Sequence, residues 1–71
     1  MSAFQRIVLN LRSAGLSSTA IAQRIHSTPA TINHIARGEI VDPRWSTGLG
    51  LLTLHHKHCR DAHEREVYGR F

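Results

Sequence analysis

The sequence is poor in several residue types, and each shortage narrows the class of protein. Cys59 is the single cysteine among 71 residues, so an internal disulfide cannot form, which fits a cytoplasmic protein. The longest apolar run, near Leu49–Leu54, is far too short to span a bilayer, and no signal-peptide pattern is present. With 41% apolar residues, the chain is expected to form one folded domain, 1–71, with no room for a catalytic domain.

Acidic residues are missing from the first half of the chain. Residues 1–38 carry four arginines (Arg6, Arg12, Arg24 and Arg37) and no acid, whereas residues 39–71 carry five bases and five acids. The formal net charge of +4 therefore lies entirely in the first 38 residues. This asymmetry suits a nucleic-acid partner, because a duplex backbone is a dense line of negative charge.

The segment from Ala3 to Ala14 is expected to form the first helix. Ser2 lies at its N-cap position, and Gln5, three residues later, completes the spacing of a capping box. Gly15 follows at the position of a left-handed C-terminal cap. One buried stripe at helical spacing is formed by Phe4, Ile7, Val8 and Leu11.

Two short helices joined by a tight turn are predicted within residues 16–38, LSSTAIAQRIHSTPATINHIARG. The first spans 18–25, with Ser17 as its cap and Leu16 at the spacing of a hydrophobic staple. The second spans 29–37, with Thr28 as its cap and Pro29 at its first position, and Gly38 ends it. The core-facing residues are expected to be Ile21, Ala22, Ile25, Ile32, Ile35 and Ala36.

A fourth helix is expected over residues 46–60, after a connector that Asp42-Pro43 keeps from being helical. One face at helical spacing holds Trp45, Leu49, Leu52, His56 and Cys59. We expect Trp45 and Leu52 to close the core. Leu51 and Leu54 lie off that face, so the helix is apolar over a wide arc, and Gly48 and Gly50 lower its intrinsic helix propensity. The charged tail, 61–71, either continues this helix or frays.

The segment 17–38 resembles the helix-turn-helix of the Cro/repressor (XRE-like) family of phage and bacterial transcription regulators. Its pattern is Ala22 in the first motif helix, then Ile32 and Ile35 in the second, closed by Ile35-Ala36-Arg37-Gly38. The resemblance implies an all-α, lambda-repressor-like domain of four to five short helices. Family members usually have glycine where this chain has His26, a turn position that favours a positive φ, and histidine is among the residues that tolerate it.

The resemblance implies that the helix 29–37 is the recognition helix, which enters the major groove of double-stranded DNA. Asn33 carries an amide that can pair with adenine N6 and N7. Arg37 is a phosphate contact or, instead, a cation that offsets the helix C-terminus. The candidates for base contact are Thr28, Pro29, Ala30, Asn33 and His34. The candidates for phosphate contact are Ser17, Ser18, Thr19, Gln23 and Arg37. The alternative for these polar residues is a solvated helix face.

Similar regulators act as twofold dimers on near-palindromic operators, so a homodimer interface is expected. Its candidate residues are Leu49, Val67, Tyr68 and Phe71. The histidine-rich run at 55–63 places His55, Cys59 and His63 on one helical face. We expect no metal site there, because structural zinc takes four ligands from two elements and no second cysteine exists. We likewise expect no catalytic residues and no cofactor, because no oxyanion site accompanies the Cys59–histidine pairs.

The predicted function is therefore sequence-specific DNA binding, with transcriptional repression by promoter occlusion in a bacterial cytoplasm. One alternative is a protein-interaction helical module, antitoxin-like or adaptor-like, that does not bind DNA. A second is the DNA-binding part of an enzyme such as a recombinase, which the Met1 start and the missing catalytic residues oppose. Salt dependence separates DNA binding from the protein-interaction module, since phosphate contacts weaken steeply as salt rises.

Overall fold

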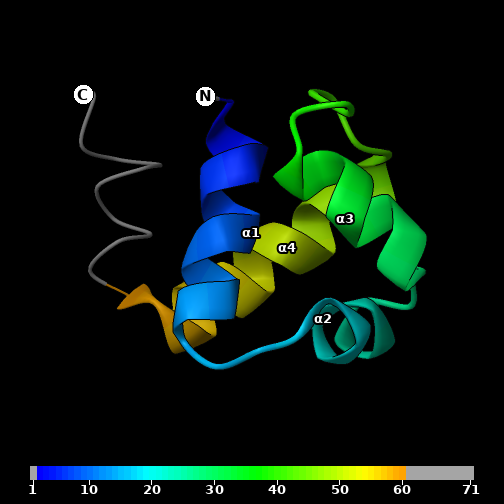
Figure 1. Ribbon diagram of the computed structural model, residues 1–71. Coiled ribbons are helices and arrows are strands. Elements are labelled where there is room, and N and C mark those ends of the chain that lie inside the picture. The colour runs from blue at the N-terminus through cyan, green and yellow to red at the C-terminus, as the bar shows by residue number, and fades with distance from the viewer. Residues whose placement is uncertain (1, 61–71) are drawn as a thin grey trace.

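The structure, a computed structural model, describes residues 2–60, and its regular elements are four α-helices (Figure 1). They are α1 (Ala3–Ser13), α2 (Ser18–Arg24), α3 (Pro29–Ala36) and α4 (Trp45–His58). No strand occurs within the described range, so this part of the chain is all-helical as expected. The three N-terminal helices end one residue before their predicted ends, and α4 begins one residue before the expected start at 46.

The first three helices begin at the predicted capping residues. The Ser2 hydroxyl accepts a hydrogen bond from the Gln5 amide at 3.1 Å, and the Ser17 hydroxyl accepts one from the Ala20 amide at 3.1 Å. The Thr28 hydroxyl accepts one from the Thr31 amide at 3.3 Å. Each bond satisfies a donor that the first turn of a helix leaves without an intrahelical partner. The starts of α1, α2 and α3 are thus fixed by short-range sequence signals.

The turn between α2 and α3 has the left-handed residue that its sequence position predicts. His26 adopts a φ of +56°, the one positive φ among the described non-glycine residues. The next amide, of Ser27, donates to the Ala22 carbonyl at 2.9 Å, so the chain reverses closely around the end of α2. A histidine in this conformation costs more than a glycine would, but the turn is formed.

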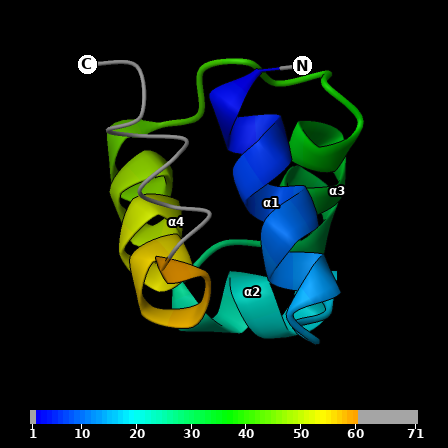
Figure 2. The ribbon, with the colours of Figure 1, turned by 90° about the vertical axis from the view of Figure 1, so that its left-hand side faces the viewer.

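The core lies where the four helices meet. Helix α1 packs against both α3 and α4, and α2 packs against α3 and, less extensively, α4. Figure 2 shows α1 between α4 on one side and α3 on the other, with α2 crossing beneath them. The buried apolar residues are Ile7, Val8, Leu11, Ile21, Ala22, Ile32, Ile35, Ala36, Leu51 and Leu54. Every predicted core position on the first three helices is buried except Phe4 and Ile25, which pack against the core and are partly buried.

Helix α4 buries a different face from the predicted one. Trp45 is 79% exposed and Leu49 is 44% exposed, whereas Leu51 is fully buried and Leu54 is 7% exposed. The prediction that Trp45 closes the core is therefore wrong, and Leu52 is only partly buried. The two glycines lie about 200° apart around α4, at the two edges of this buried face, and they let α1 and the end of α2 approach the helix closely there. A Cβ atom at Gly50 would lie 2.8 Å from Cβ of Ile25, and one at Gly48 would lie 3.3 Å from Cζ of Phe4.

The helices in the described part of the chain are all too short or too polar to cross a membrane.

Candidate nucleic-acid interface

The exposed edge of α3 carries most of the residues predicted to contact bases. Thr28, Pro29, Ala30 and His34 are exposed, and Asn33 is partly buried. The opposite face of α3 is the core face of Ile32 and Ile35, so the helix orientation follows from its apolar spacing. The residues of this edge thus share one side of α3, with Asn33 nearest to the neighbouring helices.

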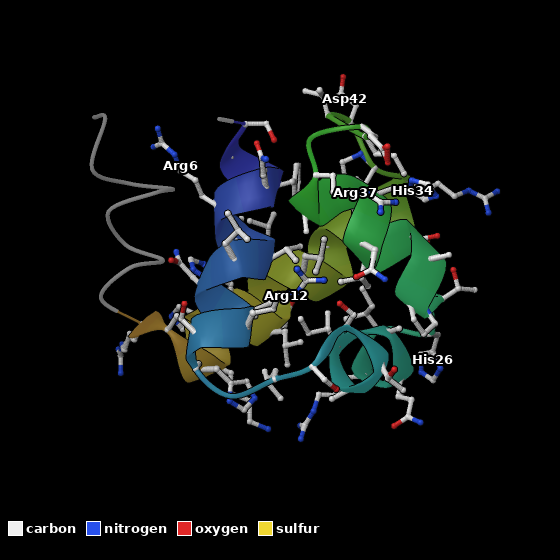
Figure 3. The ribbon with its side chains drawn as sticks, viewed as in Figure 1. Arg6, Arg12, His26, His34, Arg37 and Asp42 are labelled. Carbon is white, nitrogen blue, oxygen red and sulfur yellow. The ribbon has the colours of Figure 1, made fainter. Side chains whose placement is uncertain are left out.

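Asn33 belongs to a hydrogen-bonded group that joins three helices. Its Oδ1 atom accepts from the hydroxyl of Ser18, on α2, at 2.7 Å, and from Nη2 of Arg12, on α1. The same Arg12 nitrogen also donates to the Ser18 hydroxyl. Figure 3 shows Arg12 extending from α1 toward α3. Two predicted DNA contacts, Ser18 and Asn33, are therefore brought together, and both are used inside the protein.

A second group lies at the C-terminal end of α3 and includes an acid. Nδ1 of His34 lies 2.7 Å from Oε1 of Glu39, and Nε of Arg37 donates to the same oxygen at 3.1 Å. His34 and Arg37 lie side by side at this end of the helix (Figure 3). The hydrogen bond from His34 is the main reason that the pKa of Glu39 is lowered, and the charge of Arg37 acts in the same direction. His34 and Arg37, which are expected to face DNA, are thus exposed. Both contact the carboxylate of Glu39, which lies directly after the acid-free segment 1–38.

Of the four candidates for phosphate contact on or next to α2, two make hydrogen bonds within the protein and two are exposed. Ser17 is engaged as the N-cap and Ser18 in the group with Asn33, whereas Thr19 and Gln23 are exposed. A groove of mixed polar and apolar lining runs next to the first turn of α3, where Thr28 and Thr31 lie beside Asp42 of the connector and Arg44 at the start of α4. The beginning of α4 therefore lies close to the beginning of α3.

The histidine-rich run does not form a metal cluster within residues 2–60, where no three histidine, cysteine or acidic side chains converge. His55 is instead fully buried, and its Nε2 lies 3.2 Å from Nδ2 of Asn10, on α1. The Cys59 thiol donates to the Asn10 carbonyl at 3.5 Å, and burial raises the pKa of this thiol. These three residues tie the C-terminal half of α4 to α1. His63, Val67, Tyr68 and Phe71 lie outside the described residues.

Two residues at this interface were not singled out from the sequence. The sequence predicts nothing for Arg12 beyond its charge, and it predicts no role for Glu39. Both lie next to α3 because of tertiary packing or a turn, and neither has a recognisable spacing to Asn33 or His34 in the sequence. For Glu39 a weak signal existed, since it follows the helix-ending Gly38 directly and lies two residues from Arg37.

Comparisons of the chain with protein-family models, with curated proteins and with solved structures gave no match.

Proposed function

We propose that the protein binds double-stranded DNA sequence-specifically, with α2, the His26 turn and α3 acting as a helix-turn-helix whose second helix enters the major groove. The observation that carries the proposal is the exposed polar edge of α3 within a 38-residue segment that holds four arginines and no acid. Residues near the start of a recognition helix reach base edges in this mode of binding. Thr28, Pro29, Ala30 and Asn33 are the residues that this assigns to base contact.

Phosphate contacts are assigned to exposed groups around that edge. Arg12 on α1 and Thr19 and Gln23 on α2 are exposed, and Arg12 reaches Asn33 on α3. Arg37 lies at the far end of α3, where Glu39 already neutralises part of its charge. We therefore assign a larger share of the electrostatic attraction to Arg12 than to Arg37.

The proposed mode of action is repression by a homodimer that occludes a promoter. Twofold dimers pair with near-palindromic operators because the spacing of the half-sites mirrors the symmetry of the protein. The predicted interface residue Leu49, on α4, is 44% exposed and so is available for a contact between two copies. No ligand-sensing part is assigned to the described residues.

The experiment that tests the proposal is selection of bound duplexes from a random pool, followed by affinity measurements over a range of salt. We expect one enriched sequence of near-palindromic form. We also expect log K to fall linearly with log salt, with a slope of about −0.9 for each phosphate contacted. Enrichment of no sequence, together with a flat salt dependence, contradicts DNA binding.

A protein-interaction module remains the second candidate, because of a specific observation on α4 and the connector before it. Trp45 is 79% exposed, Val41 is 59% exposed and Leu49 is 44% exposed. Large exposed apolar side chains are typical of surfaces that another protein covers. Such binding depends mainly on apolar burial and would change little between low and high salt, so the same salt series separates the two functions.

A further inference from the structure

The orientation of the Asn33 side-chain amide follows from its partners. A guanidinium carries only donors, so the amide atom that faces Arg12 must be the oxygen. The Ser18 hydroxyl donates its hydrogen to the same oxygen while it accepts from Arg12, so all three contacts agree with one another. The assignment of oxygen and nitrogen in this amide thus follows from the hydrogen-bond chemistry.

The consequence is that the two ends of the amide differ in what they can still bind. Both acceptor positions of Oδ1 are used by Ser18 and Arg12. The Nδ2 group, by contrast, has no hydrogen-bond partner within residues 2–60. Asn33 is only partly buried, so it can offer this group to a partner. Toward a ligand, Asn33 is therefore a donor without an acceptor.

We propose that Ser18 and Arg12 act as positioning residues that make Asn33 read a hydrogen-bond acceptor, guanine in preference to adenine, in the DNA major groove. This inference rests on the proposed DNA binding. Bidentate pairing with adenine requires a free asparagine oxygen to accept from N6. With Oδ1 occupied, the N6 amino group of adenine, which is a donor, would face the Nδ2 group of Asn33, which is also a donor. Guanine presents two acceptors, N7 and O6, to the same amino group.

This assignment changes the expectation for Asn33 taken from the sequence, which was an adenine contact. It also gives the hydrogen-bonded group at the α1–α2–α3 junction a function beyond holding helices together. A purely structural role for Ser18 and Arg12 would alter stability and overall affinity. It would not alter which base is preferred at one position of the site.

The experiment measures affinities for the selected duplex and for its versions with each of the other three bases at the position sensitive to Asn33. That position is found with Asn33→Ala, which removes discrimination there. We expect the wild-type protein to prefer guanine at it. We expect Ser18→Ala combined with Arg12→Met, which frees Oδ1, to shift the adenine-to-guanine affinity ratio by about tenfold toward adenine. The matched control is Ser13→Ala combined with Arg24→Met, which removes one exposed hydroxyl and one exposed cation elsewhere.

A second variant tests the same idea while it keeps the internal contacts. Asn33→Asp retains oxygen atoms that accept from Ser18 and Arg12, but it replaces the outward donor with an acceptor. We expect the preference at that position to leave guanine for a base that presents an amino donor, cytosine or adenine. Overall affinity falls because of the added charge, so the ratio between bases is the readout. Circular dichroism confirms that each variant is folded.

The outcomes separate the two levels of inference. If the wild-type protein binds no duplex specifically, the proposed function fails and this inference fails with it. If it binds specifically and Asn33→Ala locates a position where wild type prefers adenine, only the assignment of Asn33 as a donor is overturned. The same holds if the base ratios of the freed variant and of Asn33→Asp match those of wild type.

Discussion

Helices α3 and α4 differ in what fixes their start and their orientation in the fold. Helix α3 begins with a side-chain cap from Thr28 and a proline at its first position, and it buries a regular isoleucine stripe. Helix α4 begins at Trp45, its N-cap residue Arg44 makes no side-chain cap hydrogen bond, and glycines occupy two positions of its first turns. The orientation of α3 is thus encoded within its own segment. The orientation of α4 is decided by the helices that it must approach.

The largest expected effect tests which face of α4 is buried. Leu51→Ala removes a fully buried side chain, so we expect a loss of about 2–5 kcal/mol in the free energy of unfolding. Leu49→Ala is the matched control on the same helix, because its side chain is 44% exposed and should cost much less. Urea unfolding followed by circular dichroism measures both. Equal losses, or a larger loss for Leu49→Ala, would show that α4 buries the face predicted from the sequence, which carries Leu49 and Leu52.

The next effect tests whether the close approach of α4 depends on Gly50. In Gly50→Ala the new Cβ would lie 2.8 Å from Cβ of Ile25, an atom next to the backbone that cannot move independently. Overpacking of this kind costs about 1–3 kcal/mol, against about 1 kcal/mol gained in helix propensity. We expect a net destabilisation of about 1 kcal/mol in thermal or urea unfolding.

Gly48→Ala is the control for that measurement. Its new Cβ would lie 3.3 Å from the far end of the Phe4 ring, which can shift by a few tenths of an ångström, and at an ordinary 3.9 Å from Cγ of Pro43. The gain in helix propensity then makes the substitution neutral or stabilising. If Gly50→Ala stabilises the protein as well, close approach is not what orients α4.

A smaller effect tests the local encoding of α3. Thr28→Ala removes the hydroxyl that accepts from the Thr31 amide, so we expect a loss of about 1 kcal/mol in stability. Thr28→Ser keeps the acceptor and should lose much less. Unfolding midpoints of the two variants, compared with wild type, provide the measurement. A full loss in Thr28→Ser would show that the methyl group, rather than the cap, is what stabilises the turn.

The smallest effect concerns Glu39, which lies just after the C-terminal end of α3. The pKa of Glu39 is lowered below its ordinary value of 4.5, so its carboxylate favours the folded state above that pH. This contribution should disappear as the pH falls through the lowered pKa. The stability difference between wild type and Glu39→Gln should therefore be small near neutral pH and vanish in acid. Chemical unfolding at several pH values measures it, and a difference that persists below the lowered pKa of Glu39 would contradict the pairing.

The caps, the turn and the core of the first three helices could be predicted because each depends on residues a few positions apart. Ser2, Ser17 and Thr28 cap amides three residues later, and His26 lies where the pattern requires a left-handed residue. The buried face of α4 could not be predicted in this way. From the sequence the glycines of α4 indicate only weak helix propensity, whereas in the structure they let Phe4 and Ile25 pack close to the helix axis.

The candidate site was predictable to a similar extent. The exposed residues of α3 follow from the isoleucine stripe on its other side, since the two faces of one helix are complementary. What Asn33 contacts depends instead on Arg12, 21 residues away along the chain. The role of Glu39 depends on the bend after Gly38, which brings its carboxylate back to His34 and Arg37. Contacts of this kind are set by the packed structure and leave no periodic pattern in the sequence.

The exposure of Trp45 determines how this protein can be followed by fluorescence. It is the single tryptophan of the chain and is 79% exposed, so its indole is already surrounded by water when the protein is folded. Indole emission moves to shorter wavelength when water is removed from around the ring. Unfolding should therefore leave the emission maximum nearly unchanged, whereas any macromolecule that covers the start of α4 should shift it to the blue. The protein thus carries its own reporter of complex formation, and one that is almost silent to denaturation.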